Sequence, residues 1–271
     1  MGRFRAATSA PWFTDSGPAR GYLVVFPRTA VRITHAGRSP VVADRTRAMF
    51  YNLGQEYRRE RLSSDGDRCE WFSFRPEDVA EAIRRFDPGV EERIDRPFGT
   101  IDGPSDALTY ASQRVLFEHA AAGDAHALMV EETCMLLLDR VVANAYASRG
   151  TIARAPGEQA RRAHRAVADA VKELLATRFA EALCLDDIAC AVGASSFHVA
   201  RVFRSETGGT IHAHVHALRL RHALERIADG VDLTRLGLDL GYSSHSHFTL
   251  AFRRAFGVPP STMRATLRAR S

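Results

Sequence analysis

Histidine spacing gives this sequence its clearest candidates for chemistry, and two groups lie in the second half of the chain. His212 and His216 are four residues apart, a spacing at which two imidazoles on one helix can bind zinc. No Glu or Cys neighbour completes such a ligand shell. His245 and His247 are two residues apart, so they point in different directions on a helix, and no nucleophile or carboxylate accompanies them. We therefore expect neither a metal site nor a catalytic pair at these positions.

The four cysteines do not indicate a metal site or a disulfide framework either. Cys69, Cys134, Cys184 and Cys190 include no Cys-x-x-Cys spacing. They match neither a zinc ligand set nor the pattern of a small secreted domain, so we interpret them as small buried apolar residues. We expect a protein that is not an enzyme.

Positive charge is concentrated in the second half of the chain. The 271 residues carry a net charge of +5. Residues 1–150 contain 20 Arg against 21 Asp and Glu, whereas residues 151–271 contain 17 Lys and Arg against 11 Asp and Glu. A genome that prefers arginine codons would explain the residue type but not this asymmetry. Because arginine binds phosphate and guanine in a bidentate manner, the second half is the better candidate for such contacts.

The elements that must position these residues differ between the two halves. Short runs of β-branched and aromatic residues, separated by turn formers, predict strands over Gly21–Pro27, Ala30–Gly37, Pro40–Gly54, Glu56–Leu62 and Cys69–Phe74. Their spacing predicts a compact antiparallel barrel or sandwich. A short helix is expected over Pro76–Phe86, with acids in its first turn and arginines in its last.

Two longer helices are expected over Ser105–Ala122 and Asp124–Ser148, joined as an antiparallel hairpin. The second is apolar on more than one face, so it must be covered by its own domain or by another subunit. The Gly and Pro residues of Ala147–Gln159 indicate a linker, and the remaining chain has a helical pattern. We expect a first domain over 1–148, a linker over 149–159 and a second domain over 160–271.

Two segments of the second domain, Leu185–Gly208 and Leu233–Gly257, repeat one pattern, and their final glycines are 49 residues apart. In each, a short amphipathic helix ends at Gly193 or Gly241, where a left-handed backbone is needed. A serine that can cap a second helix follows. That second helix buries one face and leaves the other free. This is the helix-turn-helix pattern, whose second helix enters the major groove of DNA.

Residues 161–270 resemble the tandem helix-turn-helix domain of the AraC/XylS family of bacterial transcription regulators. The resemblance is carried by "LDDIACAVGASSFHVARVFRSETG", "LRLRHALERI" and "LGLDLGYSSHSHFTLAFRRAFGVPPS". The first half resembles the family's cupin-like sensor domains more weakly, through "PRTAVRITHAGRSPVVADRTRAMFYNLGQEYR" and "GDRCEWFSF". The resemblance implies an α+β chain, in which a cupin-like β-barrel with appended helices precedes an all-α DNA-binding domain. It also implies an activator or repressor whose partners are double-stranded promoter DNA and RNA polymerase.

The resemblance places the DNA contacts on one face of each second helix. By position, the residues expected to contact DNA are Ser196, Phe197, His198, Ala200, Arg201, Arg204, His245, Ser246, Thr249, Arg253 and Arg254. Arg201 is the best candidate for a guanine contact, whereas Arg204 and Arg254 are candidates for phosphate contacts. Core packing of Phe197, an ion pair of Arg253 and a solvated face around Arg204 and Arg254 remain alternatives.

The first domain could bind a small-molecule effector inside its barrel. Candidate lining residues are inward-facing aromatic and polar side chains: Phe26, Arg28, His35, Phe50, Asn52, Tyr57 and Trp71. Simple core packing is the alternative for each of them. The pair of His with a Glu that metal-binding cupins carry does not appear around His35, so we expect no metal and no cofactor.

Two other interpretations of the first domain stay open. It could be a cupin-type metalloenzyme domain fused to a DNA-binding module, or it could only dimerise without a ligand. We expect a homodimer formed through Asp124–Ser148. No apolar run approaches the roughly 20 residues that span a bilayer, and the N-terminus has arginines but no apolar signal-peptide core. We therefore expect a cytoplasmic protein with no membrane association.

Overall fold

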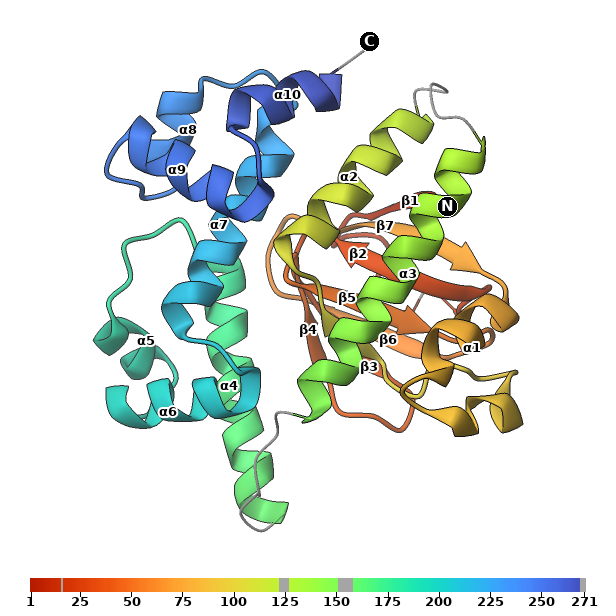
Figure 1. The fold of residues 1–271 in the computed structure, drawn as a ribbon. Coiled ribbons are helices and arrows are strands. Elements are labelled where there is room, and N and C mark those ends of the chain that lie inside the picture. Colours follow the sequence, from red (N-terminus) through yellow and green to blue (C-terminus); the bar gives the residue numbers. More distant parts are fainter. Residues whose placement is uncertain (16, 122–126, 151–157, 269–271) are drawn as a thin grey trace. The chain divides into compact units, whose positions relative to one another are not determined.

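The chain folds as two units of different architecture, which Figure 1 shows in a computed structural model. The structure describes residues 1–271 except 16, 122–126, 151–157 and 269–271. The first unit comprises Met1–Thr109 and His126–Gly150, and the second comprises Tyr110–Ala125 and Thr151–Ser271. Residues 151–157, the greater part of the expected linker, lie outside the described residues.

Antiparallel strands form two sheets in the first unit (Figure 1). A five-stranded sheet has the order β1 (Gly2–Ala6), β7 (Asp67–Phe74), β2 (Tyr22–Pro27), β5 (Arg47–Tyr51) and β8 (Asp102–Pro104). A three-stranded sheet has the order β4 (Val41–Ala43), β3 (Val31–His35) and β6 (Tyr57–Arg61). The expected α+β chain with an N-terminal β-domain is confirmed. Among the described residues, the strands pair as two sheets rather than as one closed barrel.

Alternation along the strands sends one set of side chains into the core of the first unit. In β3, Val31, Ile33 and His35 are buried while the residues between them are only partly covered. They pack in a cluster that includes Met49 and Tyr51 of β5. The β-branched residues that predicted these strands are therefore also the residues that form the core.

A buried ion pair joins the two sheets. The guanidinium of Arg59, on β6, lies 2.5 Å from the carboxylate of Asp67, on β7, and both side chains are at most 5% exposed. Arg59 also donates a hydrogen bond to the carbonyl oxygen of Phe13 at 2.9 Å. Burial raises the pKa of Asp67, and the facing arginine opposes that shift. Removing the arginine would leave the buried charge of Asp67 without this ion pair, which costs about 3–5 kcal/mol.

Helices cover part of the first unit. They are α1 (Pro76–Arg84), the short 3-10 helix η1 (Pro88–Arg93) and α3 (Ala127–Gly150). α3 packs closely on β8, where a Cβ added to Gly103 would lie 2.5 Å from the Cβ of Ala145. The other side of α3 leaves apolar residues exposed, with Leu136 71% exposed and Met129 and Met135 more than 40% exposed. The described part of the chain contains no helix long and apolar enough to cross a membrane.

Asp106 holds the beginning of α2 (Ala107–Ala121) to α3. One of its carboxylate oxygens accepts the backbone N–H of Thr109 at 2.9 Å, in the manner of an N-cap residue. The other accepts hydrogen bonds from Arg140 Nε at 2.9 Å and from Asn144 Nδ2 at 2.8 Å. Desolvation acts to raise the pKa of Asp106, but these hydrogen bonds outweigh it and the pKa is lowered.

Most of α2 belongs to the second unit. The hydroxyl of Tyr110 donates a hydrogen bond to Glu225 Oε1 at 2.7 Å, and Arg114 Nε lies 3.3 Å from the same oxygen. All three side chains are buried. An ionised carboxylate in such surroundings needs these donors, so the contact fixes the helix in place.

All helices and strands assigned to the described residues of the second unit are helices (Figure 1). After α2 it contains α4 (Glu158–Arg178), α5 (Leu185–Ala191), α6 (Ser196–Thr207), α7 (Ile211–Ile227), α8 (Leu233–Asp239), α9 (His245–Phe256) and α10 (Pro260–Arg268). α4 and α7 contribute Val171, Leu175 and Leu218 to a core around α5 and α6. The all-helical second part is confirmed.

Candidate DNA-binding interface

Local signals in the sequence build the first helix-turn-helix, which consists of α5 and α6. α5 begins with a reciprocal cap, in which Cys184 Sγ accepts the backbone N–H of Asp187 at 3.4 Å and the Asp187 carboxylate accepts the backbone N–H of Cys184 at 2.8 Å. Gly193 follows with a φ of +69°, a conformation that residues with a Cβ rarely adopt. Ser195 then caps α6 by accepting the backbone N–H of His198 at 3.3 Å.

The second helix-turn-helix, formed by α8 and α9, repeats this construction. Asp232 caps α8 by accepting the backbone N–H of Arg235 at 2.6 Å. Gly241 has a φ of +76° in the turn, and Ser244 caps α9 by accepting the backbone N–H of His247 at 3.1 Å. The turns and caps expected from the sequence are therefore confirmed in both helix-turn-helix motifs.

Each second helix buries one face and ends at a left-handed glycine, Gly208 or Gly257. The buried residues are Val199, Val202 and Phe203 in α6, and Phe248, Phe252 and Phe256 in α9. Because the buried residues recur three or four positions after Val199 in α6 and every four positions in α9, they share one face and leave the opposite face of each helix free. That free face is the surface that could contact DNA.

Arg219, on α7, ties the two helix-turn-helix units together. Its guanidinium donates to the carbonyl oxygens of Phe179 at 2.7 Å and Glu181 at 2.9 Å, both in the segment between α4 and α5. A third, longer hydrogen bond of 3.4 Å reaches the carbonyl oxygen of Gly241, in the turn between α8 and α9. Burial lowers the pKa of Arg219. The sequence did not reveal this role, because its three acceptors are backbone groups about 20 to 40 residues away.

The free face of α6 presents two arginines. Arg201 and Arg204 are exposed, and within the described part of the chain neither guanidinium has an ion-pair or hydrogen-bond partner. Ser196 is occupied, since its hydroxyl donates to the carboxylate of Asp186. Of the remaining expected contacts, His198 and Ala200 are half-buried, and the side chain of Phe197 lies outside the described residues.

The free face of α9 also presents two arginines. Arg253 and Arg254 are exposed and have no side-chain partner among the described residues. Ser246 is exposed beside them, whereas Thr249 is half-buried. His245 is exposed and lies between two hydroxyls, with Nδ1 3.4 Å from Thr234 Oγ1 and Nε2 3.3 Å from Thr249 Oγ1.

His247 has a local structural role. Its Nδ1 lies 3.1 Å from the hydroxyl of Ser243, and its ring centroid lies 5.4 Å from that of Tyr242. These contacts hold it over the turn that precedes α9. Its imidazole is therefore engaged beside the turn rather than with His245, as the two-residue spacing predicted.

The sequence did not indicate that Leu250 lies on the free face of α9. It is 49% exposed on the free face of α9. It occupies the position equivalent to Arg201, because Leu250 follows Arg201 by 49 residues, as Gly257 follows Gly208. A leucine within a helical apolar pattern is usually assigned to the core. Only the positions of the buried phenylalanines show that it points away from the core.

The histidine and cysteine patterns can be compared with the geometry. The rings of His212 and His216 lie 5.7 Å apart, and no group of three or more His, Cys, Asp or Glu that could hold a metal occurs among the described residues. The expectation that every cysteine is buried is confirmed for Cys69 alone among the four; Cys134 is half-buried, and Cys184 and Cys190 are exposed. In Cys184, the sulfur caps a helix and so stays at the surface.

The residues expected to line an effector site in the first unit have different surroundings. Phe26 and Phe50 are core residues whose rings pack on Phe72 and Phe98, at centroid distances of 5.9 and 5.1 Å. Arg28 donates a hydrogen bond to Glu70 at 3.1 Å.

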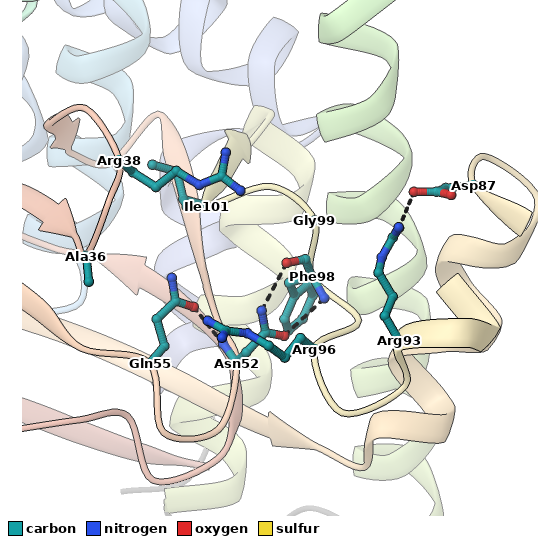
Figure 2. A pocket seen from close by; sticks show the side chains of 10 residues that line it. All are labelled: Ala36, Arg38, Asn52, Gln55, Asp87, Arg93, Arg96, Phe98, Gly99 and Ile101. Carbon is teal, nitrogen blue, oxygen red and sulfur yellow. Dashed lines mark hydrogen bonds and ion pairs between the residues drawn. The ribbon is translucent and has the colours of Figure 1, made fainter. Parts of the chain in front are cut away.

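His35 is fully buried, and Tyr57 and Trp71 are half-buried. Burial lowers the pKa of His35 to about 4. Asn52 lines a cavity of about 420 Å³ (Figure 2). The other six expected residues do not belong to the lining of this cavity, as far as the described residues show.

Comparison with known proteins points to the same part of the chain. Residues 188–266, from α5 into α10, match a family described as a helix-turn-helix domain. A transcriptional regulator of Chromobacterium violaceum, described among AraC-type DNA-binding domain-containing proteins, is 28% identical over 41% of this chain and 99% of its own, with a TM-score of 0.36.

Two further solved structures are similar to this chain. A DNA-binding transcriptional dual regulator of Escherichia coli K-12 is 23% identical over 38% of this chain and 94% of its own, with a TM-score of 0.36. ToxT of Vibrio cholerae is 10% identical over 98% of both chains, with a TM-score of 0.36. The family match coincides with the two helix-turn-helix units of the structure, so the expected tandem domain is confirmed.

Proposed function

We propose that this protein is a DNA-binding transcription regulator of the AraC/XylS family, that it reads promoter DNA with the free faces of α6 and α9, and that a small molecule bound by its first unit controls it. DNA binding is supported by four exposed arginines on these two faces, whose guanidinium groups have no ion-pair or hydrogen-bond partner among the described residues: Arg201, Arg204, Arg253 and Arg254. Unpaired guanidinium groups aligned on one helix face suit phosphate and guanine.

The two helices would read different bases. Arg201 would make a bidentate contact with guanine, worth about 1–3 kcal/mol of discrimination. At the equivalent position of α9, Leu250 offers an apolar contact, which suits the methyl group of thymine. Arg204 and its counterpart Arg253 flank these positions, and together with Arg254 they are suited to phosphate contacts that fix the register.

Binding can be tested on DNA fragments that lie upstream of the gene for this protein. We expect an affinity that falls steeply with salt, because phosphate contacts release counterions. Arg204→Gln and Arg254→Gln should each reduce the slope of log K against log salt by about 1. Arg201→Gln should instead relax the preference at one base pair. Arg58→Gln, an exposed arginine of the first unit, provides a control with the same loss of charge. An affinity that does not depend on salt, or no binding to any such fragment, would contradict the proposal.

The remaining parts of the proposal concern partners. A homodimer through α3 is supported by the exposure of Leu136, Met129 and Met135, since exposed apolar residues along one helix are typical of interfaces. Sedimentation at micromolar concentration should give a dimer mass, and Leu136→Glu should give the monomer mass. Regulation would take place in the cytoplasm and involve RNA polymerase. Stoichiometric iron, zinc or manganese in the purified protein would instead favour a metalloenzyme role for the first unit.

A further inference from the structure

Half of the ten residues that line the cavity of about 420 Å³ in the first unit have side chains that donate hydrogen bonds: Arg38, Asn52, Gln55, Arg93 and Arg96. Figure 2 shows Arg38 and Arg96 reaching toward the same space, with Arg93 beside Asp87 at the far side. Arg38 follows β3, and Arg96 follows η1. A volume of this size is in the range of pockets that hold small organic molecules, about 300–1,000 Å³.

The cavity has a fixed floor. Asn52, which is 5% exposed, donates from Nδ2 to the carbonyl oxygen of Phe98 at 3.0 Å and accepts the backbone N–H of Phe98 at 3.1 Å (Figure 2). This pair of hydrogen bonds binds the loop after β5 to the segment that carries Arg96. The two parts of the lining are therefore held in register before any ligand arrives.

Gln55 is oriented so that its amide nitrogen remains a donor. Its Oε1 accepts the backbone N–H of Asn52 at 3.0 Å, and its Nε2 lies 2.6 Å from His35 Nδ1. Because burial lowers the pKa of His35 to about 4, the imidazole is neutral near pH 7 and its Nδ1 can accept this hydrogen bond. An amide nitrogen carries two hydrogens, so one remains for a ligand.

The charges of the lining do not cancel. The lining includes three arginines and one aspartate, and Asp87 forms an ion pair with Arg93. The guanidinium groups of Arg38 and Arg96 have no ion-pair or hydrogen-bond partner among the described residues. Two positive charges beside amide donors make a site that favours an anion.

We propose that this cavity binds a small organic anion, whose carboxylate or phosphate group is held by Arg38 and Arg96 and whose body lies against Phe98 and Ile101. The proposed site lies between the loops after β3 and β5 and the segment after η1, apart from the site inside the sheets that the sequence predicted. Anion binding does not depend on the proposed function; only an effect of the anion on DNA binding rests on the proposed effector control.

The test titrates the full-length protein with inorganic phosphate and with succinate at constant ionic strength, and follows arginine Nε–Hε resonances by NMR. The resonances that disappear in Arg38→Gln and Arg96→Gln assign the two groups. We expect saturable shifts of both in the wild type. In Arg38→Gln, the affinity measured at Arg96 should fall at least tenfold, whereas Arg58→Gln should leave it unchanged.

Tighter binding of phosphate than of succinate would assign a phosphorylated ligand, and the reverse order would assign a carboxylate. Shifts at Arg38 and Arg96 that do not saturate with either probe, or equal affinities in the wild type and Arg38→Gln, would overturn the proposal. DNA binding by the wild type without any probe is measured separately. If the wild type does not bind DNA, the proposed function is wrong, but the anion site is not affected by that result.

Discussion

Replacement of Arg219 by methionine should destabilise the second unit and leave the first unit unchanged. The substitution keeps the apolar stem of the side chain and removes three charged hydrogen bonds, to Phe179, Glu181 and Gly241. A hydrogen bond to a charged group contributes about 1.5–3 kcal/mol when buried. Two of these hydrogen bonds are 2.7 and 2.9 Å long and the third is long at 3.4 Å, and in the variant water can hydrogen-bond to the carbonyl oxygens that lose the guanidinium. We therefore expect a loss of about 2–3 kcal/mol.

The protein offers separate probes for its two units. Both tryptophans, Trp12 and Trp71, lie in the first unit, so tryptophan fluorescence follows that unit alone. The helical second unit provides a large part of the far-ultraviolet circular dichroism. In urea, Arg219→Met should move the circular dichroism transition to lower concentration while the fluorescence transition stays in place. The same variant should bind a full operator more weakly, because the two helix-turn-helix units lose their shared anchor.

Arg226 provides a matched control on the same helix. It is exposed, and among the described residues its guanidinium forms a surface ion pair of 3.6 Å with Asp229, so Arg226→Met should cost less than about 1 kcal/mol. Equal shifts for Arg219→Met and Arg226→Met would show that the backbone contacts of Arg219 contribute nothing particular. A shift of the fluorescence transition would refute the assignment of Arg219 to the second unit.

Three further predictions follow from the described contacts. Replacing one operator thymine by uracil should weaken wild-type binding about fourfold, the value of one buried methyl group, and should have no effect on Leu250→Ala; equal sensitivity of both proteins would contradict the thymine contact. Because folding lowers the pKa of Asp106, its contribution to stability is present above its ordinary value of 3.8 and is lost as pH falls below it. Urea titrations followed by tryptophan fluorescence should therefore show that the free energy of unfolding differs less between pH 7 and pH 3 for Asp106→Asn than for the wild type. The same pH difference in both proteins would refute this role. Tyr110→Phe removes a buried hydrogen bond to Glu225 and should cost about 1–3 kcal/mol in the circular dichroism transition, whereas a loss seen only by fluorescence would place α2 in the wrong unit.

Features set by neighbouring residues could be predicted from the sequence. Gly193 and Gly241 occupy the turns, and Ser195 and Ser244 cap the helices that follow. A cap needs only a side-chain oxygen three residues before a backbone N–H, so the pattern is visible in a short stretch of sequence. Strands β2, β3, β6 and β7 were predicted for the same reason, because alternation is a local property, and β4 and β5 lie within one predicted run, whereas β1 was not predicted.

Features set by distant residues could not be predicted. Alternation placed Phe26 and Phe50 on the inner side of their strands, but it does not show whether that side is packed or hollow, and both are core residues. The cavity instead uses Arg38 and Arg96, from loops that have no periodic pattern. Strand β8 was missed because its three residues are Asp-Gly-Pro, which read as a turn until the packing of α3 on Gly103 is seen.

Comparison of the two helix-turn-helix units separates residues needed for folding from those free to read DNA. At equivalent positions the caps are Ser195 and Ser244, and the flanking cations are Arg204 and Arg253. Folding fixes the caps, and under the proposed function a common phosphate geometry accounts for the flanking arginines. The position between them differs, with Arg201 in α6 and Leu250 in α9, although neither residue supports the core. Helices that dock alike but present guanidinium and isobutyl groups cannot prefer the same base pair. The operator of one chain should therefore consist of two unlike half-sites rather than a palindrome.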